Sequence, residues 1–153
     1  MASTAKENVL ALDLGAKCGW CFAEDGKILA SGTQEFKMDR YSGGGIRFLK
    51  FRKWLDRMLE RDINLIVYEE VRNHTGASDA HAYGGYMGNL TSWCEKHEIP
   101  YDAVPVGTIK KHVTGKGNAS KQMVIDAVKT RGHNPVDDNE ADAIALLYTY
   151  LEE

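Results

Sequence analysis

The stretch Val9-Leu-Ala-Leu-Asp-Leu-Gly15 is a short apolar run that carries a single acid, Asp13, and ends at a glycine. Short apolar runs closed by a turn residue are typical of strands buried on both faces. A second run of this kind, Asn64-Leu-Ile-Val-Tyr-Glu69, carries its acid at its end. The two runs therefore predict two buried strands that each present one carboxylate.

The other elements follow from turn residues and hydrophobic periodicity. Asp25-Gly26, a dipeptide favoured in hairpin turns, separates residues 19–23 from 27–36 and predicts a three-stranded antiparallel meander with the first run. The remaining expected elements are a helix over 46–59, strands over 64–69 and 99–104, and helices over 78–97, 106–113, 119–131 and 138–151. We expect Asn118 to cap the helix over 119–131 and Gly132 to close it.

This order of elements predicts one α/β domain over residues 8–153, preceded by a flexible segment of residues 1–7. The order βββαβαβ, followed by helices, indicates a mixed five-stranded sheet with helices on both faces. In the βββαβ part of such a sheet the first and fourth strands are neighbours, so Asp13 and Glu69 are expected to lie close together.

Bulk composition places the chain among ordinary globular proteins. Its 153 residues suit one domain with a buried core, and 43% of them are hydrophobic and 27% charged. No apolar run approaches the roughly 18 residues of a membrane span, and no apolar signal segment is evident near Met1. The three cysteines form neither a redox motif in the expected strand–helix context nor a zinc ligand set. We therefore expect a cytoplasmic protein without a membrane partner.

Cations are segregated along the chain although its net charge is −3. Residues 103–133 hold six cations and one anion, and residues 46–61 hold six cations and two anions. A segregated pattern can bind a polyanion at one face while the whole protein stays acidic. On charge alone, basic helices that simply face solvent explain the pattern equally well.

A third acidic cluster, Asp137-Asp-Asn-Glu-Ala-Asp142, begins the last expected helix. Asp137 and Glu140 resemble a capping box, which accounts for two of these acids. Asp138 and Asp142 are four residues apart and share one helix face, where flanking alanines allow a close approach to the sheet. Both carboxylates are then expected to point toward the acids of the two buried strands.

Three or four carboxylates that converge on one point predict a site for a hard cation. Mg²⁺ prefers oxygen ligands and keeps part of its coordination for water and phosphate. Two such ions can activate a water molecule and stabilise the leaving oxygen of a phosphodiester. We therefore expect Asp13, Glu69, Asp138 and Asp142 to hold two Mg²⁺ ions, with Mn²⁺ as a substitute.

The segment between the last strand and the acidic helix carries cations and a glycine-rich turn. It contains Lys110, Lys111, Lys116 and Lys121, and its turn Thr114-Gly-Lys-Gly117 lacks the spacing of an ATP-binding loop. Lys121 falls in the first turn of a helix, where a cation interacts unfavourably with the helix dipole. A bound phosphate would offset this unfavourable interaction and would explain the lysine. A solvated surface lysine is the alternative.

Four motifs in this order resemble the RuvC family of Holliday-junction resolvases, of the RNase H-like fold. They are a strand with Asp then Gly, a strand ending in Glu-Glu-Val, a Lys-Lys…Thr-Gly-x-Gly-x-Ala-x-Lys segment and a Glu-Ala-Asp-Ala-Ile-Ala helix. The resemblance extends from Val9 to about Tyr150 and is strongest to the compact phage forms. It implies a homodimeric, Mg²⁺-dependent endonuclease that cuts four-way DNA junctions by paired symmetric nicks, and it leaves open whether forks and flaps are cut as well.

The resemblance also implies roles for individual residues. Lys121 would lie near the scissile phosphate with the four acids, and Lys110, Lys111 and Lys116 would support the DNA backbone. Arg72 stands where the family often has an aromatic residue, so it would stack on a base or bind phosphate. Asn139 occupies a position that is often acidic or histidine in the family, which leaves open whether Asp138 or Asn139 completes the metal site.

Some alternatives remain open from the sequence. The stretch Tyr83-Gly-Gly-Tyr-Met-Gly88 either exposes aromatic rings to unstacked bases or, as we favour, allows close helix packing at a dimer interface. An RNA-cutting nuclease of the YqgF type and a protein that binds branched DNA without cutting it are the alternative functions.

Overall fold

The computed structural model describes residues 7–153, so the expected flexible segment lies almost entirely outside the described residues. The strands are β1 (Val9–Asp13), β2 (Lys17–Glu24), β3 (Lys27–Glu35), β4 (Leu65–Glu70) and β5 (Tyr101–Pro105). The helices are α1 (Ile46–Met58), a 3₁₀ turn η1 (Leu59–Arg61), α2 (Ala77–His97), α3 (Val106–Thr114), α4 (Lys121–Thr130) and α5 (Asp138–Glu152). No helix among these residues is both long and apolar enough to cross a membrane.

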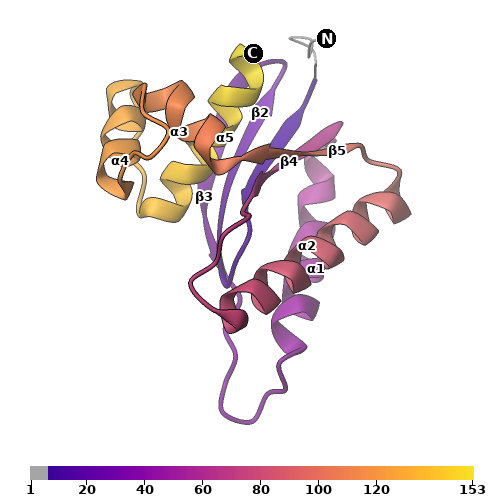
Figure 1. The fold of residues 1–153 in the computed structure, drawn as a ribbon. Coiled ribbons are helices and arrows are strands. Elements are labelled where there is room, and N and C mark those ends of the chain that lie inside the picture. Colours follow the sequence, from indigo (N-terminus) through magenta and orange to yellow (C-terminus); the bar gives the residue numbers. More distant parts are fainter. Residues whose placement is uncertain (1–6) are drawn as a thin grey trace.

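The strands form one mixed sheet in the order β3-β2-β1-β4-β5. β1 pairs antiparallel with β2 and parallel with β4, and β4 pairs parallel with β5. Helices α1 and α2 cover one face of the sheet, and α3, α4 and α5 cover the other (Figure 1). The α/β fold class, the five-stranded mixed sheet and the neighbouring first and fourth strands are thus confirmed.

Each face of the sheet has its own hydrophobic core. Leu10, Leu12, Ile66 and Tyr68 belong to the cluster under α1 and α2, which also holds Trp93. Val9, Ala11, Leu65 and Val67 belong to the cluster under α5, together with Ile144. Both β1 and β4 are therefore buried on both sides, as their continuous apolar runs predict.

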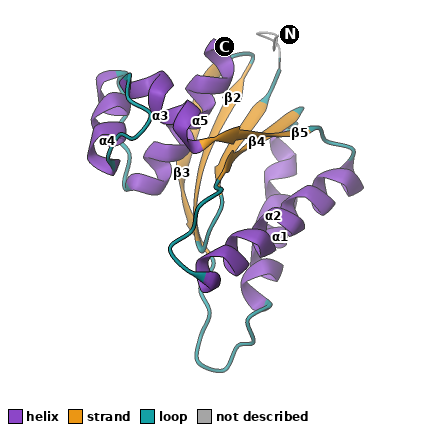
Figure 2. Ribbon diagram, in the orientation of Figure 1, coloured by secondary structure: helices purple, strands orange, loops and turns teal. Residues whose placement is uncertain are grey.

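The carboxyl ends of β1, β4 and β5 meet at one end of the sheet, and α5 begins beside them (Figure 2). The loop between β3 and α1 extends from this same end, at the bottom of the view. Polar residues at the carboxyl ends of these strands, and directly after them, are consequently close together. The β2–β3 turn at Asp25-Gly26 lies at the opposite end of the sheet.

The structure corrects the predicted cap of α4. Ser120, not Asn118, is the N-cap, and its hydroxyl accepts a hydrogen bond from the backbone N–H of Met123 at 3.2 Å. The reason is a turn before the helix, in which the N–H of the buried Ala119 donates to the carbonyl of Lys116. The predicted end at Gly132 is confirmed by its φ of 97°.

The first residue of the predicted strand 99–104, Ile99, lies instead in the turn that ends α2. Glu98 adopts a left-handed conformation with φ of 55°, and the N–H of Ile99 donates to the carbonyl of Cys94. These are the features of a helix C-terminus, so pairing in β5 starts only at Tyr101.

Of the three glycines of α2, Gly85 serves packing within the chain, whereas nothing lies within 4 Å of a Cβ added to Gly84 or Gly88. A Cβ added to Gly85 would lie 2.3 Å from the ring of Phe48 in α1. Tyr86 is fully buried and contacts that ring edge-on, at a centroid distance of 4.8 Å. Exposure of Tyr86 to unstacked bases is therefore wrong, and Gly85 packs against α1 rather than against a second chain.

Candidate metal centre

Three carboxylates converge where β1, β4 and α5 meet. Asp13 is the last residue of β1, Glu69 is the penultimate residue of β4, and Asp142 lies in the second turn of α5. One oxygen from each can be chosen so that all three lie within 4.8 Å of one another. The structure thus brings together three of the four acids predicted as metal ligands.

Strand register explains why the first two acids face the same way. Leu12 of β1 is paired with Tyr68 of β4, so the next residues along these parallel strands, Asp13 and Glu69, are also side by side. Side chains alternate along a strand, and Leu12 and Tyr68 face α1 and α2. Asp13 and Glu69 therefore face α5, while Glu70 faces away.

Helix α5 reaches these acids because one glycine removes an obstacle. Gly19 of β2 lies against the backbone of Asn139, and a Cβ at Gly19 would be 1.8 Å from the Asn139 carbonyl oxygen. Ala141 and Ala145 are fully buried at the same helix–sheet interface. The alanines were recognised in the sequence, but Gly19 was not; an isolated glycine inside a strand is a known sign of close backbone approach.

Two hydroxyl groups of β3 hold the start of α5 in place. Thr33 donates a hydrogen bond to the Asp137 carboxylate, and Ser31 donates one to Glu140, both at 2.6 Å. Asp137 also accepts from the backbone N–H of Glu140, as a helix N-cap. The Glu140 side chain accepts from the N–H of Val136, so the predicted capping box has a modified form. These contacts fix the rotation of α5 and hence the direction of Asp142.

The pKa values of the three clustered carboxyl groups indicate mutual repulsion that a cation would relieve. Burial, followed by the charges of Glu69 and Asp142, raises the pKa of Asp13 well above its ordinary value. Burial also raises the pKa of Glu69, and burial with the charges of Glu69 and Asp138 raises the pKa of Asp142 to about 7. Carboxylates forced together in this way repel one another unless a proton or a metal ion lies between them.

The donor set fits a hard divalent cation. Within residues 7–153, no hydrogen bond or ion pair engages the side-chain oxygens of Asp13, Glu69 or Asp142. Half-buried carboxylates that only carry structure normally accept hydrogen bonds from the protein. The free oxygens here are the ligands that Mg²⁺ and Mn²⁺ take in proteins.

Two of the predicted lysines face the acids. Glu69, Asp142, Lys110 and Lys121 line one hollow of about 180 Å³, walled by Val106, Ile109 and Val124. Lys110 and Lys121 each lower the pKa of Asp142, but by less than burial and the neighbouring carboxylates raise it. Lys121 is 80% exposed and lies 3.4 Å from the Asp138 carboxylate, so it can reach a ligand at this hollow.

Asp138 lies beside the cluster rather than within it. Its charge raises the pKa of both Asp13 and Asp142, but its side chain pairs with Lys121 and is not among the three converging carboxylates. Asn139 contributes its backbone to the contact with Gly19. Of Asp138 and Asn139, therefore, it is Asp138 whose charge changes the pKa values of the clustered carboxylates.

The remaining predicted DNA contacts lie outside the hollow that Lys110 and Lys121 share with Glu69 and Asp142. Lys111 and Lys116 are exposed and do not line the hollow. Arg72 lies on another hollow of about 440 Å³, which shares Glu69 and runs between the ends of β4 and β5. Its guanidinium forms an ion pair of 3.0 Å with Glu70, and its side chain is 73% exposed.

Tyr83 of α2 holds the end of β4 and was not recognised from the sequence. Its hydroxyl donates to the backbone carbonyl of Glu69 at 2.7 Å and accepts from the N–H of Val71 at 3.3 Å. The chain leaves the sheet at this point, so Tyr83 fixes the backbone that carries the Glu69 carboxylate. No local sequence pattern marks such a long-range contact.

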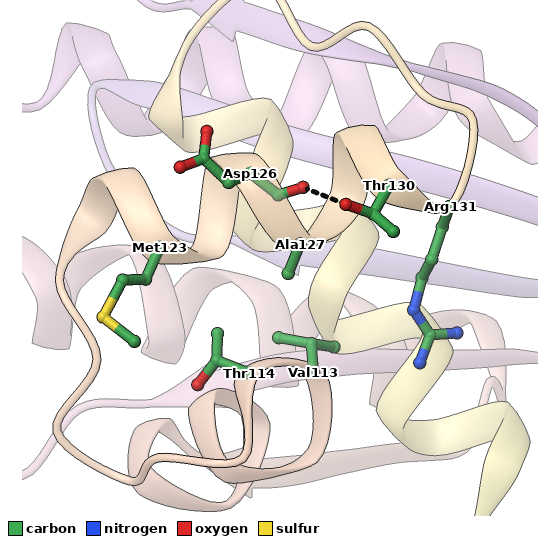
Figure 3. A pocket seen from close by; sticks show the side chains of 7 residues that line it. All are labelled: Val113, Thr114, Met123, Asp126, Ala127, Thr130 and Arg131. Carbon is green, nitrogen blue, oxygen red and sulfur yellow. Dashed lines mark hydrogen bonds between the residues drawn. The ribbon is translucent and has the colours of Figure 1, made fainter.

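A third hollow, between α3 and α4, contains none of the candidate site residues. It measures about 370 Å³, and Figure 3 shows the carbonyl of Asp126 accepting a hydrogen bond from Thr130 on one of its walls. Its lining residues are Val113, Thr114, Met123, Asp126, Ala127, Thr130 and Arg131.

The cysteines have no part in the site. Cys18 and Cys21 lie on β2 with their side chains in the two opposite cores, and Cys94 is buried in α2. Burial is the main cause that raises the pKa of each thiol. The redox interpretation of Cys18-Gly-Trp-Cys21 is thereby excluded.

Known proteins similar to this chain are junction-cutting nucleases. The chain is 30% identical over 95 residues to the crossover junction endodeoxyribonuclease RuvC of Rickettsia akari, and 28% identical over 129 residues to that of Rickettsia typhi. The first match covers 60% of each protein, so the chain spans less than two thirds of that relative, and the second covers 82% of this chain and 81% of the relative. No family model matches the chain.

The fold comparison extends over most of the chain. RuvC of Thermus thermophilus, solved in complex with a Holliday junction substrate, superimposes with a TM-score of 0.78 at 20% identity, covering 94% of this chain and 92% of that one. The chain is thus homologous to RuvC resolvases and has their RNase H-like fold.

Proposed function

We propose that this homologue of the RuvC resolvases is a divalent-metal-dependent endonuclease that cuts branched DNA. The observation that carries the proposal is the convergence of Asp13, Glu69 and Asp142 without internal hydrogen-bond donors. Similarity to nucleases named for crossover junctions supports branched DNA as the substrate class. The similarity to a structure that contains a Holliday junction supports it further.

Asp13, Glu69 and Asp142 would hold Mg²⁺, with Asp138 completing the set from the edge of the centre. The metal ions, two in our proposal, would supply an activated water and stabilise charge on the leaving oxygen. Lys121 and Lys110 would bind the phosphate that enters the hollow, because both face it. Lys111, Lys116 and Arg72 would contact the DNA backbone farther from the cut, and a homodimer would place two such centres on one junction.

The test is a cleavage assay on end-labelled four-way junction, Y-fork and linear duplex DNA and on single-stranded and duplex RNA, with Mg²⁺, Mn²⁺ or EDTA. Wild-type protein should nick the junction with either metal and not with EDTA, and Asp13→Asn should lose at least about 100-fold in rate if it removes a ligand of the metal. The matched control is Asp25→Asn, since Asp25 is exposed at the far end of the sheet and asparagine tolerates its φ of 52°.

Other outcomes of the assay would assign a different function to the protein. Cleavage that survives Asp13→Asn would contradict the proposed centre. A gel shift of the junction without any cleavage would support a binding-only protein. Cleavage of single-stranded or duplex RNA in place of the junction would favour an RNA nuclease of the YqgF type.

A further inference from the structure

Four cations of α1 lie along one side of that helix. They are Arg47, Lys50, Lys53 and Arg57, and we call them the basic stripe. At 100° per residue they fall within an arc of about 120°, and at 1.5 Å per residue they extend over about 15 Å. On the adjoining side of α1, Phe51, Leu55 and Met58 are buried in the core, and Trp54 is buried within the arc itself.

The basic stripe has no carboxylate partner among residues 7–153. Lys50 donates to the carbonyl of Lys37, and Arg47 donates to the carbonyl of Gly44 and lies over the ring of Phe48. By contrast, Lys121 and Arg131 both form ion pairs. Neighbouring cations that form no ion pair repel one another, and an external polyanion relieves that repulsion.

The basic stripe borders a hollow at the end of the edge strand β3. The hollow measures about 170 Å³ and is lined by Gln34, Glu35, Phe36, Lys50, Lys53 and Arg57. Glu35 is the one acid in this lining, against three cations. The hollow is large enough for several water molecules, and hence for the oxygens of a phosphate group.

The basic stripe lies at the same end of the sheet as the metal centre but on the other side. Thr33 of β3 is in register with Gly19 of β2, which is in register with Asp13 of β1. The end of β3 is therefore two strands, or about 10 Å, from Asp13. Helix α1 covers the face that Asp13 and Glu69 do not face (Figure 1).

We propose that the basic stripe binds the phosphate backbone of a substrate DNA arm, away from the phosphodiester that is cut. The proposal rests on the function proposed above and adds a second contact surface to it. One turn of duplex is about 34 Å long, so a single arm can extend from the centre to the stripe. A phosphate on the stripe cannot be the one at the metal centre, because the sheet lies between them.

The test compares Lys50→Gln/Lys53→Gln with Lys27→Gln/Lys96→Gln. The control lysines are exposed at the opposite end of the sheet, so both variants lose two positive charges. Dissociation constants for four-way junction and linear duplex are measured in EDTA over a range of NaCl. Each phosphate contact contributes about 0.9 to the slope of log K against log salt, so the stripe variant should lose about 1.8 from its magnitude.

We further expect the stripe variant to bind both DNAs about tenfold more weakly at low salt, as loss of sequence-independent phosphate contacts requires. Its single-turnover cleavage rate at saturating protein should stay within about twofold of wild type, because these lysines act on binding and not at the cut. Equal salt slopes for the stripe and control variants would overturn the proposal.

The same series separates this proposal from the proposed nuclease. If the wild-type chain binds the junction in EDTA but never cuts it with Mg²⁺, the proposed nuclease activity is contradicted. A reduced salt slope in the stripe variant would in that case still support DNA binding by the basic stripe. A wild-type chain that binds neither DNA would overturn both.

Discussion

Asp142 shows most directly how the metal centre depends on charge. Burial and the neighbouring carboxylates raise its pKa to about 7, from an ordinary value near 3.8. Because the folded state holds this proton more tightly than the unfolded state, the free energy of unfolding falls as pH rises from about 4 to about 7. A bound divalent cation replaces the proton, so its stabilising effect is largest above pH 7.

This argument predicts the behaviour of Asp142→Asn. In EDTA the melting temperature of wild-type protein should fall between pH 5 and pH 8. The variant should show a smaller fall, because the amide carries no charge and also relieves Asp13. At pH 8, Mg²⁺ should raise the melting temperature of wild type and raise that of the variant much less. Differential scanning fluorimetry measures the six melting temperatures that these comparisons need.

Asp25→Asn serves as the control and should follow wild type. A wild-type melting temperature that does not change from pH 5 to pH 8 in EDTA would contradict the account of the cluster. So would a variant that responds to Mg²⁺ as strongly as wild type does.

At the scale of elements, the centre depends on how closely α5 approaches β2. Gly19 is the position where the two backbones meet, since its missing Cβ would lie 1.8 Å from the Asn139 carbonyl oxygen. Both backbones are fixed there, β2 by pairing with two strands and α5 by Thr33 and Ser31. An added methyl group can only be accommodated by moving the start of α5, which carries Asp138 and Asp142.

Gly19→Ala is therefore expected to destabilise the protein and to weaken metal binding together. Overpacking of a tight interface costs about 1–3 kcal/mol, which urea unfolding at fixed Mg²⁺ measures. The Mg²⁺ concentration for half-maximal cleavage should rise, because Asp142 no longer meets Asp13 and Glu69. Gly43→Ala is the control, since nothing lies within 4 Å of a Cβ there; a Gly19→Ala chain as stable as this control would refute the close contact.

The elements could be predicted from the sequence to the extent that their signals are local. Burial is visible in the apolar runs that carry Asp13 and Glu69, and turn geometry is visible in the dipeptide Asp25-Gly26. These local signals were enough to predict the sheet and the positions of two of its acids. The cap at Ser120 was missed because Asn118 has the same intrinsic preference and only the packing of Ala119 decides between them. The Tyr83 contact joins distant elements and leaves no local pattern.

At the scale of the whole molecule, one chain provides one cluster of converging acids among its described residues. In the function proposed above, the paired symmetric cuts in a four-way junction would use two such centres, one for each strand. Within one chain the centre has different surroundings on its two sides, with α3–α5 on one face of the sheet and α1–α2 on the other (Figure 1). For the symmetric reaction proposed above, we therefore expect a second copy of the chain, related by a two-fold axis, to supply the second centre.

A mixed dimer tests this expectation. Wild-type and Asp13→Asn chains carrying different affinity tags are co-expressed, and particles that carry both tags are isolated. On a plasmid that extrudes a four-way junction, wild-type protein should convert the circle to linear DNA, whereas the mixed dimer should produce mainly nicked circles. The mutant centre binds its strand but cannot cut it, so one nick per junction is left.

Light scattering on the purified wild-type protein, with and without junction DNA, should show two chains per particle. Linear product from the mixed dimer at the wild-type rate would mean that a single active centre cuts both strands in turn. In that case the second copy would be needed only for binding, and the symmetry of the reaction would come from the junction and not from the protein.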